Sequence, residues 1–270
     1  MIKLRAPGRK AIKVSPIRPS AAEESAYRAR LNRMIDTMHS SVMVHVQSAW
    51  KDAGLAMDAD PHAVLKRAMA KLGVQWQKTF DSESKNIAEA FANGAMRHGD
   101  LAFTSALRKS GFSVKFQTDA EVSKALDSAV GENIKLIKSI PQEYMDRVSK
   151  GIRESIDNGR NMGQLTKDLQ NIHGMTKRRA ALIARDQNNK ATALIHRVRQ
   201  RQVGITRAQW VHTVASVHPR EEHAAWSDSG ETYDINEGMY SDEDGEFVWP
   251  GTPINCGCIS MSIVPGSEED

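Results

Sequence analysis

Apolar residues recur every three or four positions along most of the first two hundred residues, the spacing of one buried face of an α-helix. Breaks are expected at residues 81–84 and 111–113, and Pro61 and Pro141 are placed as first residues of helices. Residues 113–117 alternate briefly, which is typical of a short strand. The predicted helices cover residues 21–50, 61–72, 86–98, 121–130, 132–140, 141–158, 162–172 and 180–204.

Beyond Gly204 the period of the pattern changes to two, which predicts strands. The expected core faces carry Ala208, Trp210, His212 and Val214 in one strand and Ile259, Met261 and Ile263 in the last one. The opposite face of the last strand carries Cys256, Cys258, Ser260 and Ser262. The fold class is therefore mainly α, with a helical N-terminal and central body and a small C-terminal α+β domain. The predicted division is a basic extended arm (1–20), an N-terminal helical region (21–112), a central helical region (113–204) and a C-terminal cap (205–270).

Charge is unevenly distributed along the 270 residues, although the net charge is only +4. Residues 1–20 hold six basic residues and no acidic one, and residues 177–207 hold nine basic residues against the single Asp186. Residues 228–246 hold eight acids and no Lys or Arg. Such segregation predicts separate partner surfaces, with polyanions as candidates for the basic ones. No apolar run approaches the length of a membrane span and no secretory signal is recognisable, so we expect synthesis in the cytoplasm and no membrane partner.

Two alternatives remain for each basic segment. Prolines prevent a packed helix in residues 1–20, which are either a tail without a partner or an arm ordered by nucleic acid or a neighbouring subunit. The basic helix either presents a solvated face or contacts the phosphates of double-stranded DNA, in a way that depends on salt and not on base sequence. The absence of interleaved aromatics argues against stacking on single strands. The candidate DNA-binding residues are Lys177, Arg178, Arg185, Lys190, Arg197 and Arg201.

The only two cysteines and several histidines lie close together near the C-terminus. Cys256 and Cys258 with His218 and His223 provide two thiolates and two imidazoles, a ligand set suited to zinc. The alternative is that the cysteines are small packing residues and that the histidines bond to loop backbone. A Cys–His nucleophile lacks a recognisable orienting group or oxyanion hole, so no catalytic residue is predicted.

Arg220 lies between the two histidines and next to Glu221 and Glu222. A guanidinium presents a rigid fork of donors, so Arg220 is expected to clamp a carboxylate and fix the loop. Contact with a phosphate is the alternative.

An ordered set of motifs resembles the phage Mu protein F-like family of minor head, or head morphogenesis, proteins. Its elements are Ile183-Ala184-Arg185-Asp186-Gln187 on a helix, then Gly204, Trp210, Arg220-x-x-His223, a glycine near Gly230, Trp249-Pro250-Gly251 and Asn255-Cys256-Gly257-Cys258. The likeness extends over roughly residues 113–265. Two positions depart from the family pattern, because Gly257 replaces an arginine and Gln187 stands where an acid is usual.

The resemblance implies a tailed-phage head protein present in few copies in the virion head interior, and in the host cytoplasm during assembly. Implied partners are the portal protein, a capsid or scaffold protein and packaged DNA. An established enzyme is not implied. The alternatives are a metal-dependent hydrolase or nucleotide-using transferase carried in the head, and a host-encoded DNA-binding protein derived from prophage sequence.

Overall fold

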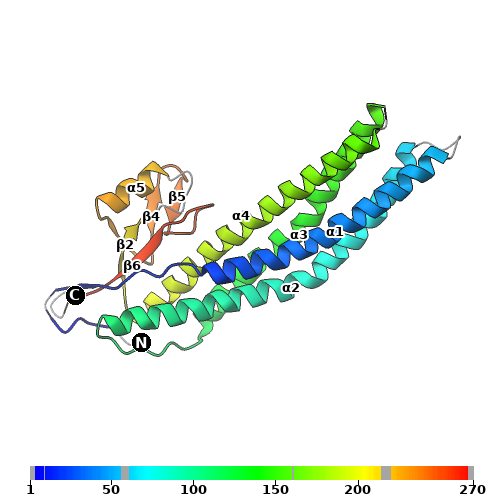
Figure 1. Ribbon diagram of the computed structural model, residues 1–270. Coiled ribbons are helices and arrows are strands. Elements are labelled where there is room, and N and C mark those ends of the chain that lie inside the picture. Colours follow the sequence, from blue (N-terminus) through cyan, green and yellow to red (C-terminus); the bar gives the residue numbers. More distant parts are fainter. Residues whose placement is uncertain (1–3, 9, 56–60, 160, 214–219, 267–270) are drawn as a thin grey trace. The chain divides into compact units, whose positions relative to one another are not determined.

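The computed structural model describes residues 4–8, 10–55, 61–159, 161–213 and 220–266. Four long helices precede a small C-terminal region of strands and one short helix, as Figure 1 shows. The predicted fold class, mainly α with a small α+β domain, is confirmed. The helices are α1 (Ala21–Leu55), α2 (Pro61–Lys109), α3 (Ala120–Asp157), α4 (Met162–Gln202) and α5 (Glu221–Asp228). None of the described helices is both long and apolar enough to cross a membrane.

Polar side chains satisfy the first turns of three of the long helices. The Ser20 hydroxyl accepts from the Glu23 amide, Asp119 Oδ1 from the Val122 amide at 2.9 Å and Asn161 Oδ1 from the Gln164 amide at 3.0 Å. These bonds pair donors that have no partner within a helix. They explain where α1, α3 and α4 begin.

The helices are longer than the sequence predicts, because several expected breaks are absent. Residues 81–84 continue α2, since the hydroxyls of Ser82 and Ser84 bond back to main-chain carbonyls one turn earlier. Pro141 lies inside α3, where the loss of one main-chain bond costs about 3 kcal/mol. Helix α4 likewise continues through residues 173–179. In α3 a continuous stripe of buried side chains offsets the cost of Pro141. The stripe in α3 comprises Ile137, Ile140, Tyr144, Met145, Val148 and Ile152.

The chain forms two compact units, and each long helix contributes a segment to both. We call residues 25–89 with 131–184 the helical unit, and residues 1–24, 90–130 and 185–270 the sheet unit. These units are not the consecutive segments expected from the sequence, because helices that fold back on one another bring together residues far apart in the chain. Leu31, Ile35 and Val42 on α1 are fully buried in the helical unit, as are Phe80 and Leu165.

The sheet unit contains a four-stranded antiparallel sheet in the order β1-β6-β2-β3 and a β4–β5 hairpin. The bounds are β1 (Ile12–Lys13), β2 (Arg207–Val211), β3 (Thr232–Asp234), β4 (Met239–Ser241), β5 (Glu246–Val248) and β6 (Ile259–Val264). The expected strand at residues 113–117 is absent, and the Gln117 carbonyl accepts instead from the side chains of Arg199 and Gln202. The segment between β2 and β6 has local structure of its own, because it contains α5, β3 and the β4–β5 hairpin.

The basic N-terminal segment is not a free tail, because it packs within the sheet unit. Ile12 pairs with Val264 of β6, and the amides of Leu4 and Ala6 bond to the carbonyls of Val203 and Pro265. The apolar side chains of this segment are buried against α2, the end of α4 and β6. The alternation of basic and apolar residues thus describes an edge strand, which the prolines among them had obscured.

The predicted faces of β6 are partly wrong. Ser262 is buried and accepts from Gln200 Nε2 at 2.8 Å, while Met261 and Ile263 are half-buried. Because helix α4 supplies a polar partner on that side, a serine is accommodated where the alternation assigned an exposed position.

His196 on α4 makes the sheet unit sensitive to acid. Its ring is 5% exposed, contacts Phe103 edge to face, and lies 3.4 Å through Nε2 from Ser262 Oγ. Burial lowers the pKa of His196 to about 3. Since the unfolded chain binds this proton near pH 6.5, stability is expected to fall as the pH drops from about 6.5 towards 3, by about 2 kcal/mol between pH 7 and pH 5. Urea unfolding at the two pH values should show a smaller difference for His196→Leu, and an equal difference would contradict this assignment.

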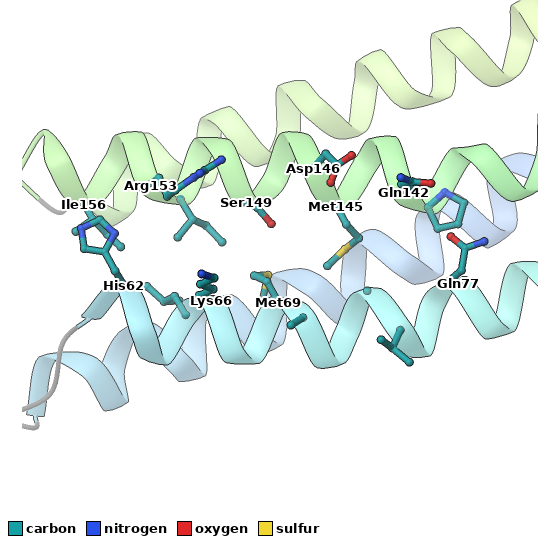
Figure 2. Close-up of a pocket in the computed structure, with 16 residues that line it drawn as sticks. His62, Lys66, Met69, Gln77, Gln142, Met145, Asp146, Ser149, Arg153 and Ile156 are labelled. Carbon is teal, nitrogen blue, oxygen red and sulfur yellow. The ribbon is translucent and has the colours of Figure 1, made fainter.

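An apolar cavity of about 680 Å³ lies between α2 and α3 within the helical unit, and Figure 2 shows the side chains that line it. Its floor is formed by buried Leu65, Met69, Met145 and Ile152. Val74 on its wall is 59% exposed. We call this cavity the α2/α3 groove.

Candidate metal centre

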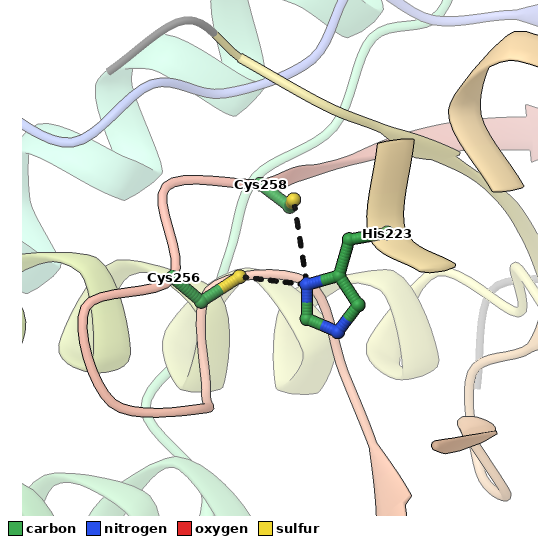
Figure 3. Close-up of side chains that lie close together, drawn as sticks. All are labelled: His223, Cys256 and Cys258. Atoms are coloured by element: carbon green, nitrogen blue, oxygen red, sulfur yellow. Dashed lines mark hydrogen bonds between the residues drawn. The ribbon is translucent and has the colours of Figure 1, made fainter. Parts of the chain in front are cut away.

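The only two cysteines meet a buried histidine in the sheet unit. Nδ1 of His223 lies 3.6 Å from Cys256 Sγ and 3.9 Å from Cys258 Sγ, as Figure 3 shows. Both cysteines are free thiols, and all three side chains are less than 5% exposed. One ligand atom of each residue lies within 4.8 Å of the others, so the three can contact one small ion.

Aromatic packing holds His223 in place. The residue lies in the first turn of α5, and its ring packs against Trp210 with centroids 4.7 Å apart and against Trp226 at 5.2 Å. Trp210 is fully buried in β2 and also contacts Trp226 edge to face at 4.8 Å. Nδ1 of His223 faces the sulfurs. Nε2 of His223 is buried, with no hydrogen-bond partner among the described residues.

Helix α4 positions the loop that carries the cysteines. Asn255 has φ 58°, a conformation that asparagine tolerates, and its amide donates to Asp186 Oδ1 at 2.7 Å. The Asn189 side chain donates to the Cys256 carbonyl at 2.9 Å, and the Thr213 hydroxyl donates to the Gly257 carbonyl at 2.7 Å. The motif residues around Asp186 and those around Cys256 thus meet in space.

Gly251 brings this loop close to α4. Its φ is 85°, and an added Cβ would lie 3.2 Å from the Cys258 carbonyl oxygen and 3.3 Å from Ala193 Cβ. Pro250, which precedes it, is buried. The Pro250-Gly251 pair therefore serves a close approach of main chain to helix.

The two thiols share one proton in their buried setting. A hydrogen bond from the Cys258 thiol lowers the pKa of Cys256, and the same bond raises the pKa of Cys258. His223 further lowers the pKa of Cys256. The cluster thus favours a single thiolate on Cys256.

The structure brings together three of the four predicted metal ligands and adds one that the sequence analysis missed. His218 lies outside the described residues. His212 follows β2 directly, and its Nδ1 lies 3.5 Å from Cys258 Sγ. The sequence signal for His212 was its place at the end of a predicted strand, as the cysteines lie at the start of another. The pairing of Val211 with Ile259 brings those two ends together.

Arg220 contacts the acidic loop and the cysteine loop. Its guanidinium lies 3.1 Å from Asp244 Oδ1 and 3.7 Å from Glu243 Oε2, and it donates to the Ile254 carbonyl at 3.4 Å. The neighbouring Glu222 carboxylate accepts from the Ser241 hydroxyl and the Asp242 amide. These contacts tie the start of α5 to the β4–β5 hairpin.

Most of the six cations predicted to contact DNA are engaged within the chain. Lys177 lies 3.0 Å from Asp36, Lys190 lies 3.2 Å from Asp186, and Arg201 lies 2.9 Å from Glu121. Arg197 stacks over the Trp249 ring at 4.0 Å. Within the described part of the chain, Arg178 and Arg185 make no such contact.

The fold and this cluster define a mainly α-helical protein whose small α+β domain carries a buried Cys–His centre on an α4-supported loop. The family described as "Phage Mu protein F like protein" matches residues 146–261. This confirms the resemblance that the motifs indicated and supports a phage head morphogenesis protein. The match spans α4, the strands from β2 to β5 and both cysteines, and it ends within β6.

A relative from Haemophilus influenzae, described as an uncharacterized protein, is 24% identical over 265 residues. The alignment covers 96% of this chain and 57% of the relative, so the chain spans little more than half of that protein's length. No solved structure matches the chain.

Proposed function

We propose that this chain is a minor head protein of a tailed phage, which joins the head at the portal and stays inside it. The observation that carries the proposal is the family match over residues 146–261, together with the meeting of its motifs in one site. Family membership of this kind implies capsid-related partners and a place in the virion.

The α2/α3 groove is the surface that we assign to the portal protein. Its lining runs along α2 from His62 to Gln77, a length of about 22 Å at the rise of an α-helix. Such a groove accepts the apolar face of a partner helix of about four turns. Lys66 and Arg153, both exposed at one end, favour carboxylates on that helix.

Val74→Glu is expected to weaken binding of the portal protein by about 30-fold, since a carboxylate would be buried in the apolar contact. Val74 is 59% exposed in the free protein, so the fold should survive. The measurement is the affinity of the purified chain for the portal protein of the same phage, by biosensor or calorimetry.

Leu101→Glu is the matched control, because Leu101 is an apolar residue of α2 that is 73% exposed and does not line the groove. It should bind as the unaltered chain does. Equal affinities for all three proteins would exclude the groove as the portal surface.

Two other predicted roles receive less support. Contact with packaged DNA would depend on Arg178 and Arg185, because the remaining four candidates already have partners within the chain. A hydrolase or transferase needs a reacting group that substrate can reach, and His223 and both cysteines are buried. The Cys–His centre therefore favours a structural role.

A further inference from the structure

Three sulfur–nitrogen distances within the Cys–His cluster are close to those of a tetrahedral zinc site. With Zn–S bonds of about 2.3 Å and Zn–N bonds of about 2.0 Å, a sulfur and a nitrogen ligand lie about 3.6 Å apart. The observed separations are 3.6 Å for Cys256 Sγ to His223 Nδ1, 3.9 Å for Cys258 Sγ to the same atom, and 3.5 Å for Cys258 Sγ to His212 Nδ1.

We propose that His212, His223, Cys256 and Cys258 bind one Zn²⁺ ion and that this ion is structural. The inference rests on the geometry of the cluster and not on the role in head assembly. Two thiolates and two imidazoles fill all four positions of a tetrahedral ion, which leaves none for a substrate.

His212 is the fourth ligand because the sheet itself delivers it. Val211 pairs with Ile259, so the residue after β2 comes beside the residue before β6, which is Cys258. The group of ligand atoms that all lie within 4.8 Å of one another comprises His223, Cys256 and Cys258, so His212 would shift from its place beside Cys258 to complete the tetrahedron.

The second nitrogen of His223 fits a metal-bound imidazole. When Nδ1 binds the ion, the proton of the ring resides on Nε2, which is buried. The carboxylates of Glu222 and Asp244 form a group with His223 whose ligand atoms lie within 4.8 Å of one another. Carboxylates beside a ligating histidine commonly support it, and these two lie near the ring without a hydrogen bond to Nε2.

Zinc at this position would join three segments by direct bonds. His212 follows β2, His223 lies in the first turn of α5, and the cysteines lie on the loop before β6. Because a structural metal contributes its binding free energy to folding, removal of the ion should loosen the sheet unit while the helical unit persists.

The test is the zinc content of the purified full-length chain after dialysis against metal-free buffer, measured by elemental mass spectrometry. We expect one zinc per chain, and loss of the ion from a Cys256→Ser, Cys258→Ser double variant. His212→Gln should weaken zinc binding by at least about 100-fold, since losing a direct ligand costs more than losing an outer partner. His218→Gln is the matched control and should keep its zinc.

Cobalt substitution keeps the test decisive if a variant folds poorly. Co²⁺ in the site should give thiolate-to-cobalt charge-transfer absorption, and His212→Cys should retain the metal and strengthen that absorption by about half, since three thiolates replace two. Absence of stoichiometric zinc or cobalt in the unaltered chain would overturn the site. Zinc lost in His218→Gln but kept in His212→Gln would overturn the assignment of His212 as the fourth ligand.

Discussion

Replacing Trp210 by alanine is expected to destabilise the sheet unit more than any other single truncation. The indole is fully buried and packs against His223, Trp226 and Tyr233, with ring centroids 4.7, 4.8 and 6.1 Å away. Removal of a buried tryptophan side chain costs about 3–5 kcal/mol, because both the transfer free energy and the packing of its neighbours are lost. That is a large part of the total stability of a typical domain.

The measurement is urea unfolding followed by near-ultraviolet circular dichroism. Tyr240→Ala is the control, since Tyr240 is 53% exposed on the β4–β5 hairpin and contacts only the exposed Phe247 ring among the aromatic residues described. Its loss should cost less than about 1 kcal/mol. If the two variants unfolded at the same urea concentration, Trp210 would not be the centre of this core.

Replacing Asp100 by alanine is the second change with a large expected effect. Arg199 is 2% exposed, and its guanidinium makes two bonds of 2.7 Å to the Asp100 carboxylate. It also donates to the Gln117 carbonyl and to Gln202. Removing one partner of a buried pair leaves an uncompensated charge, which costs about 3 kcal/mol, at the low end because Asp100 is 27% exposed.

A second variant separates the free-energy cost of the unpaired Arg199 charge from the cost of lost packing. Arg199→Met combined with Asp100→Leu should recover much of the stability, because apolar replacement of a buried pair is often neutral. The exposed pair Lys150–Glu154 is the control, and Glu154→Ala should cost less than about 0.5 kcal/mol. Chemical denaturation of the variants checks these values, and a double variant less stable than Asp100→Ala alone would contradict the explanation.

The helical part of the fold was readable from the sequence because it depends on a local period. The period could not show that the helices are continuous. Ser82, Ser84 and Pro141 are local signals for breaks, but both serines bond to carbonyls of their own helix and Pro141 lies within a helix held by tertiary packing. The N-terminal strand was missed for a related reason. Its pairing with Val264 joins positions about 250 residues apart, and no local pattern reports such a partner.

The sequence predicted most residue types of the candidate site but not how they are arranged in space. Cys256, Cys258 and His223 were selected by chemistry, and the structure places them together. His212 was assigned to a strand face and not to the cluster, because its neighbourhood with Cys258 arises from the register of β2 with β6. Asp186 lies in the α4 motif and Asn189 lies two residues beyond it, and the role of both in holding the cysteine loop is seen only in the fold.

The proposed function requires this chain to be built into the phage head. Quantitative mass spectrometry of purified DNA-filled heads, from the phage or prophage that encodes the chain, measures its presence there. We expect the chain in those particles at a fixed, low ratio to the capsid subunits and in proportion to the portal protein. Complete heads that lack the chain, with all of it left in the cell lysate, would exclude a role as a head protein.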